Sequence, residues 1–270
     1  MTAISTPQQV PTPAGPVRAT LLITGRTVSH WRSQPGQLVM AAAFPIMLVL
    51  MMGGMFGGAI SGDVASYLNL LMPGMLVLTM FFGLASTMQS VINDAEKGIT
   101  DRFRTMPVPA TAIIGGRVLA ELILLVVSIV VLTVVGIALG WRWHAPWWSV
   151  LAGYGVLLLL GIAVVWLGIA VALQAGQGWI QMVNIVVWPL GFLSAVFVDP
   201  ATMPGWLGAI AAWNPLSWTT NAVRMLTGSP VPTDTHLPTL FSGPFAVVGC
   251  VALLAVAVPW AATAYRRLSR

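Results

Sequence analysis

Charged side chains are scarce in this sequence. The 7 acidic and 12 basic residues make up 7% of 270 positions, whereas about a quarter of the residues in a soluble domain are charged. A soluble fold of this length needs a polar surface that so few charges cannot supply. Because 57% of the residues are hydrophobic, the composition excludes an ordinary soluble domain and indicates that lipid surrounds the protein.

Residue types that carry chemistry are also scarce. The single cysteine, Cys250, excludes an internal disulfide, and its apolar surroundings indicate a packing residue. The 3 histidines lie too far apart in the sequence for metal-ligand spacing. The only lysine, Lys97, follows no glycine-rich phosphate loop, and no nucleophile elbow is present. We therefore predict no catalytic, cofactor-binding or metal site, and we expect that this chain is not an enzyme.

Long apolar stretches are what the sequence has in abundance. A bilayer has a hydrocarbon core roughly 30 Å thick, so a spanning helix needs about 20 mainly apolar residues. Six stretches meet this requirement: 38–60, 68–92, 113–139, 148–173, 180–198 and 241–265. We therefore predict an all-α integral membrane protein with six transmembrane helices.

The residues before the first apolar stretch differ from the rest of the chain. Residues 1–16 are rich in Thr, Pro, Gln and Ala, which predicts a disordered tail. From Val17 onward, apolar positions recur at helical spacing, which indicates an interfacial helix that ends at Pro35 and Gly36. The first 37 residues hold no apolar run of the signal-peptide type, so we expect no cleaved targeting segment.

The positions of Lys and Arg predict the orientation, because cytoplasmic flanks carry the excess of positive charge. With both chain ends in the cytoplasm, ten of the 12 basic residues lie inside and only Arg142 and Arg224 lie outside. Four tryptophans between residues 141 and 148 mark an external membrane interface. The expected location is the inner or plasma membrane. The basic residues lie between apolar runs, so we expect no nucleic-acid partner.

The predicted external region, residues 199–240, is too apolar for a solvated loop. Its helical spacing predicts two short re-entrant helices that dip into the outer leaflet. Asn214 and Pro215 are typical of a helix start, with Asn as N-cap and Pro at the first helical position. Ser217, Asn221 and Arg224 form a polar stripe on the second of these helices.

The predicted internal segment, residues 93–111, joins the second and third spans. Asp94, Lys97, Asp101 and Arg104 fall on one helical face, opposite apolar residues. This pattern indicates a docking surface, although a solvated amphipathic helix explains the periodicity equally well.

Two further groups of polar residues fall within or beside the spans. Arg117 and Glu121 are four residues apart, which favours an intramembrane ion pair, and Glu121 as a gate or a contact for a cationic substrate is the alternative. A second stripe lies between the fourth and fifth spans and comprises Gln174, Gln177, Gln181 and Asn184. These amides either line the cytoplasmic entrance of a transport path or bond to neighbouring helices.

Two motifs resemble those of a known family. The run from Asn93 to Pro107 is similar to the Glu-x-Gly-Thr-x-x-Arg-x-x-x-x-Pro segment of type-2 ATP-binding-cassette exporter permeases. The match is imperfect, because Ile99 and Thr100 stand where Gly-Thr would continue. Asn214-Pro215-Leu216 and Arg224 are similar to the Asn-Pro and Arg stretch before the last span of these permeases. With the six-span layout, the resemblance extends over residues 17–270. Within the family, the chain looks most like permeases of drug and lipid exporters related to daunorubicin resistance transporters.

The resemblance implies that this chain is the membrane half of an ATP-driven exporter of amphipathic drugs or lipids. ATP and Mg would bind to a separate cytoplasmic ATP-binding subunit. Segment 93–111 would be the coupling helix: Glu96, Arg102 and Arg104 would touch the ATPase, and Gly98 and Pro107 would shape its turns. A second permease, identical or different, would complete the path among membrane lipids. A polysaccharide exporter permease, a lipid-modifying membrane enzyme and a non-transport assembly or sensor protein are the alternatives.

Overall fold

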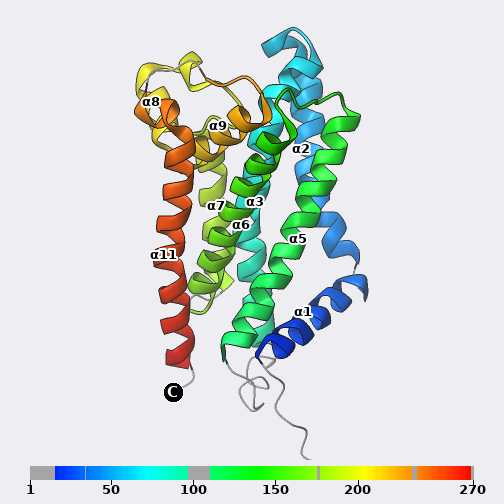
Figure 1. Ribbon diagram of the computed structural model, residues 1–270, viewed down its shortest axis with the longest axis vertical. Helices are drawn as coiled ribbons and strands as arrows, with labels where there is room; N and C mark the ends of the chain where they lie inside the picture. Colours follow the sequence, from blue (N-terminus) through cyan, green and yellow to red (C-terminus); the bar gives the residue numbers. More distant parts are fainter. Residues whose placement is uncertain (1–15, 34, 97–109, 175–176, 233–235, 269–270) are drawn as a thin grey trace, which may run out of the picture.

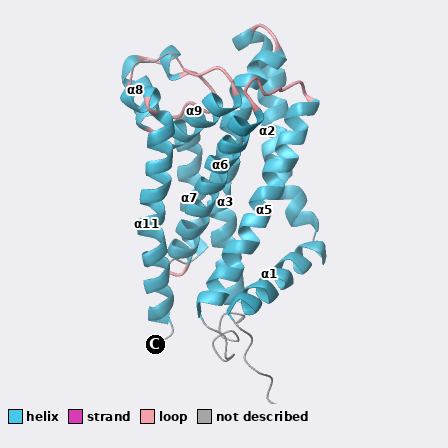
Figure 2. Ribbon diagram, in the orientation of Figure 1, coloured by secondary structure: helices cyan, strands magenta, loops and turns pink. Residues whose placement is uncertain are grey.

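A computed structural model describes residues 16–33, 35–96, 110–174, 177–232 and 236–268 as a bundle of helices (Figures 1 and 2). These ranges contain no strand, so the prediction of an all-α chain is confirmed for the described residues. Apart from Pro16, the predicted disordered tail lies outside these ranges.

Within the described ranges, five helices are long and apolar enough to cross a membrane. A helix satisfies its own backbone hydrogen bonds, which lipid cannot do, and this is why long apolar runs fold in this way. The five are α2 (Pro35–Ser61), α3 (Val64–Glu96), α5 (Ala110–Ala138), α6 (Trp147–Ala172) and α11 (Ser242–Leu268). They lie over five of the six predicted spans.

The remaining predicted span, residues 180–198, has a different structure from the one expected. Helix α7 (Gln177–Phe192) has 16 residues, which correspond to about 24 Å at the rise of an α-helix. The chain then continues through buried turns at residues 194–197 instead of remaining helical. The helix therefore ends six residues before the predicted boundary, and α7 is shorter than the helices that are long enough to span by themselves.

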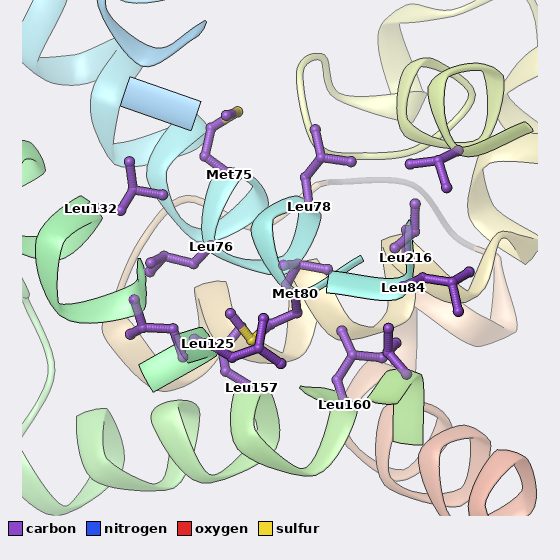
Figure 3. Packing of buried hydrophobic residues seen from close by; sticks show 14 of the residues in the cluster. Met75, Leu76, Leu78, Met80, Leu84, Leu125, Leu132, Leu157, Leu160 and Leu216 are labelled. Atoms are coloured by element: carbon purple, nitrogen blue, oxygen red, sulfur yellow. The ribbon is translucent and has the colours of Figure 1, made fainter. Parts of the chain in front are cut away.

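Helix α3 occupies the centre of the bundle. It packs against α2, α5, α6, α7 and α9, and all ten residues from 71 to 80 are buried. Figure 3 shows side chains of α3 meeting leucines of α5, α6 and α9. Because lipid tails are as apolar as leucine, these contacts stabilise the bundle by van der Waals packing more than by the hydrophobic effect.

The two ends of the bundle differ in character. Helix α1 (Pro16–Ser33) and the end of α11 lie at one end, whereas α8 (Gly205–Trp213) and α9 (Pro215–Thr227) lie at the other (Figure 1). The 3-10 helix η1 (Pro200–Thr202) precedes α8, and α10 (Leu237–Leu240) precedes α11. Two short helices were predicted in residues 199–240, and α8 and α9 occupy that region.

Helix α9 begins and ends with clear local signals. The Asn214 Oδ1 atom accepts a hydrogen bond from the Leu216 N–H at 2.9 Å, and Pro215 takes the first helical position. Gly228 ends the helix with φ of 72°, a left-handed conformation that favours glycine. A Cβ atom at this position would also lie 2.7 Å from the His144 carbonyl carbon.

Candidate functional site

Arg224 lies at the centre of a buried polar network at the α8–α9 end of the bundle. Its Nε and Nη2 atoms donate to the Leu70 carbonyl at 3.1 and 2.8 Å, and Nη2 also lies 3.4 Å from the Val196 carbonyl oxygen. Its Nη1 atom donates to Asn221 Oδ1 at 3.2 Å. These contacts join α9 to α3 and to the non-helical residues after α7.

The side chain of Arg224 is fully buried, and burial lowers its pKa to about 10, while Asp199 and Tyr67 act in the opposite direction. The guanidinium is therefore charged at neutral pH. A buried charge is tolerated when hydrogen bonds replace those that it made with water. The backbone carbonyls of Leu70 and Val196 serve this purpose here.

The predicted N-cap residue Asn214 and Ser217 of the predicted polar stripe bind the backbone at and after the end of α7. The Asn214 Nδ2 atom donates to the carbonyls of Leu190 and Leu193, both at 2.8 Å. Ser217 Oγ accepts from the Ala195 N–H at 2.8 Å. The last carbonyls of a helix have no partner within it, and non-helical backbone within a membrane protein must be satisfied by other protein groups. Asn214, Ser217 and Arg224 thus supply the missing partners.

At the opposite end of the bundle, Arg117 has a partner on α3 that the sequence did not predict. It forms an ion pair with Asp94 of α3, and its Nη2 atom also donates to the Ser90 carbonyl at 3.2 Å. Glu121, which is 4% exposed, forms a hydrogen bond with the Ser90 side chain. Arg117 thus contacts α3, and its charge also acts on Glu121, so the Arg117–Glu121 pair stays a prediction.

Spacing within one helix predicts only neighbours on that helix, whereas packing of α3 against α5 offers Arg117 the Asp94 carboxylate from another helix. A signal for this arrangement exists in the sequence. Ser90 and Asp94 are four residues apart on α3, as Arg117 and Glu121 are on α5. Two polar stripes of equal spacing are able to pair when their helices lie side by side.

Of the residues predicted to contact an ATPase, Glu96 is the one that falls within the described residues. Glu96 is exposed and is the last residue of α3. Gly98, Arg102, Arg104 and Pro107 lie outside the described residues. The last turn of α3 and the first turn of α5 lie at the end of the bundle that also carries α1 (Figure 1).

The predicted path-lining amides are on the surface of the single chain. Gln174, Gln181 and Asn184 are exposed, and Gln177 is the first residue of α7. The exposed positions of the three amides place them where a second subunit, lipid or a transported molecule would meet them.

An aromatic cluster that sequence reasoning missed joins α2, α3 and α7. The ring centroids of Phe44, Phe82 and Trp188 lie 5.4–5.5 Å apart. Phe192 stacks on Trp188 at 5.9 Å and is 54% exposed. Only the pair at 188 and 192 has the helical spacing that a sequence pattern could reveal.

Comparison with known proteins gives consistent results. A family model described as ABC-2 type transporter matches residues 18–227. The chain is 33% identical over 220 residues to the daunorubicin resistance ABC transporter permease protein DrrB1 of Streptomyces coeruleorubidus, and the match covers 80% of this chain and 77% of that protein. It is 25% identical over 220 residues to the probable doxorubicin resistance ABC transporter permease protein DrrC of Mycobacterium tuberculosis, with 80% and 79% covered.

A third relative is the putative transport permease ycf38 of Cyanophora paradoxa, which is 25% identical over 216 residues, with 78% of this chain and 74% of that protein covered. The family match runs from α1 to the end of α9. It therefore includes both the Arg224 network and the contacts of Arg117 with α3.

Proposed function

Because this chain belongs to the ABC-2 type transporter family, we propose that it is the permease subunit of an ATP-driven exporter that moves amphipathic drugs or lipids out of the cytoplasm or inner leaflet. The observation that carries the proposal is the family match over residues 18–227, in a chain whose described part has five helices long enough to cross a membrane. Two relatives are named as daunorubicin and doxorubicin resistance permeases, which supports an amphipathic drug as substrate.

ATP hydrolysis belongs to a separate subunit in this proposal. The only lysine of the chain does not follow a phosphate-binding loop, so ATP and Mg bind to a cytoplasmic partner. That partner contacts segment 93–111 through Glu96, Arg102 and Arg104, with Gly98 and Pro107 shaping the turns. The α1 end of the bundle then faces the cytoplasm, in an inner or plasma membrane.

A second permease copy, or a sister permease, completes the transport path. The exposed amides of Gln174, Gln181 and Asn184, with Gln177 beside them, contribute to the cytoplasmic entrance of that path. ATP-driven closure of the partner subunits moves the coupling segments, and the dimer then opens alternately to the inside and the outside. The surrounding lipid contacts the exposed apolar side chains of α2, α5 and α11.

The test is to purify the affinity-tagged chain from its native host and identify the subunit that binds ATP. Inside-out vesicles that contain the complex are expected to accumulate doxorubicin when ATP is added. Vesicles in which the Walker A lysine of the partner is replaced serve as the control, because binding of doxorubicin to the membrane alone persists there. If no ATP-binding subunit co-purifies and accumulation does not depend on ATP, the proposed function is wrong.

A further inference from the structure

Gly116, near the start of α5, is in close contact with α1. Its carbonyl accepts a hydrogen bond from Thr24 Oγ1 at 3.1 Å, and Thr24 is buried. A Cβ atom at position 116 would lie 2.8 Å from Ile23 Cβ and 3.0 Å from the Thr20 carbonyl oxygen. Only glycine allows α1 and α5 to approach this closely without a shift of the α1 backbone.

The next residue, Arg117, contacts a different helix. It forms the ion pair with Asp94 and bonds to the Ser90 carbonyl, and both partners belong to α3. Adjacent residues of an α-helix point about 100° apart, because a turn contains 3.6 residues. One turn of α5 therefore contacts α1 with one residue and α3 with the next.

This meeting point lies beside the segment that the proposed function assigns to the ATPase. Asp94 is two residues before the end of α3 at Glu96, and Arg117 is in the second turn of α5, which begins at Ala110. The ion pair thus ties together the two helices that flank residues 97–109. Through Gly116, α1 is attached at the same level.

We propose that Gly116 and Arg117 are positioning residues that make α1, α3 and α5 move as one unit when an ATP-binding subunit displaces segment 93–111. The inference rests on the proposed function and assigns to these residues the transfer of movement into the membrane helices. Closely packed contacts have discrete arrangements and transmit displacement. When the α1 contact is loosened, ATP hydrolysis continues, but less of each displacement reaches the transport path.

The neighbouring glycine gives a matched control. A Cβ atom at Gly115 would approach no closer than 3.7 Å, to Thr20 Cγ2, which is an ordinary contact. Gly115→Ala and Gly116→Ala therefore change helix propensity alike, but only Gly116→Ala disturbs α1. The measured quantity is the doxorubicin accumulated by inside-out vesicles for each ATP hydrolysed. We expect Gly116→Ala to lower this ratio about tenfold, within the range for residues on a coupling route, and Gly115→Ala to leave it near the wild-type ratio.

The ion pair is tested by exchanging its charges. Asp94→Arg or Arg117→Asp alone places like charges together and is expected to lower the transport ratio. The double exchange restores an opposite pair and is expected to recover most of the ratio. The amount of co-purifying ATP-binding subunit is expected to stay at the wild-type level in the Gly115→Ala, Gly116→Ala and Arg117→Asp variants. A loss of that subunit in proportion to transport would show an assembly defect and overturn the positioning role.

Hydrogen exchange provides a measurement that needs no substrate. In the wild-type complex, trapping ATP with vanadate is expected to change the exchange of α1 together with that of the α3 and α5 ends. In the Gly116→Ala complex, the response of α1 is expected to disappear while that of α3 and α5 remains. An unchanged α1 response, or equal effects of Gly115→Ala and Gly116→Ala, would overturn the positioning role of Gly116. If the wild-type complex moves no doxorubicin, the proposed substrate is wrong. The hydrogen-exchange result then decides by itself whether Gly116 couples α1 to α5.

Discussion

At the residue scale, the fully buried guanidinium of Arg224 hydrogen-bonds to the backbone carbonyl of Leu70 and to the Asn221 side chain. Arg→Lys would keep the charge but would lose the planar fork that donates from several nitrogens at once. Arg→Met would leave buried acceptors without a donor, which costs about 1–3 kcal/mol for each group.

We therefore predict that Arg224→Met lowers the thermal unfolding midpoint in detergent strongly and that Arg224→Lys lowers it less. Arg142→Met is the control, because Arg142 is an exposed arginine at the same end of the bundle and its side chain bonds to the Trp141 carbonyl. Equal midpoints for Arg224→Met and Arg142→Met would contradict the structural role of Arg224.

Glu121 gives a second prediction at the residue scale. Its carboxyl is buried and bonds to Ser90, and a glutamine amide oxygen is able to accept from the same hydroxyl. If the role is structural, Glu121→Gln transports doxorubicin at a rate close to that of the wild type when expression is matched. A loss of transport with normal expression would instead assign a gating or cation-binding function to the carboxyl group.

At the element scale, the junction between α3 and the residues after α7 depends on close backbone approach. A Cβ atom at Gly74 would lie 2.7 Å from the Val196 carbonyl oxygen and 2.8 Å from Val196 Cα. We predict that Gly74→Ala lowers the free energy of unfolding by about 1–3 kcal/mol. The added methyl group would clash with backbone atoms of Val196, which cannot move aside as a flexible side chain can.

The matched control for Gly74 is Gly155→Ala in the middle of α6. A Cβ atom there meets nothing within 4 Å, so we expect unchanged or slightly higher stability. Urea-induced or thermal unfolding in detergent measures both variants. A Gly74→Ala protein as stable as the Gly155→Ala protein would show that the two segments are able to separate without cost.

At the scale of the whole molecule, the orientation is tested through the only lysine. A membrane-impermeant amine reagent is expected to label Lys97 in broken cells but not in intact cells, because we assign segment 93–111 to the cytoplasm. Lys97→Arg controls for reaction at the chain's amino terminus. Labelling of Lys97 in intact cells would reverse the predicted topology and remove the surface on which an ATP-binding subunit is proposed to dock.

Much of the bundle was predictable because apolar runs are local signals. The run at 68–92 predicts a span, and α3 contains it at Val64–Glu96. The run at 180–198 was misleading, because its apolar composition continues past Phe192 where the helix ends. Asn214 and Ser217 form the hydrogen bonds that satisfy the backbone at the end of this helix, and they lie about 20 positions further along the chain. A pattern restricted to one stretch cannot contain that information.

Composition and hydrophobic patterning alone indicated a helical protein that is embedded in a membrane. The sequence contains no phosphate-binding loop motif, and two other motifs pointed to the permease family. These properties depend on residue type and short spacing. Only the tertiary structure decided that Arg117 pairs with Asp94, that Arg224 bonds to Leu70, and that Gly116 receives α1. Those choices depend on which helices lie side by side, and many pairings of apolar helices satisfy the same sequence pattern until packing selects one.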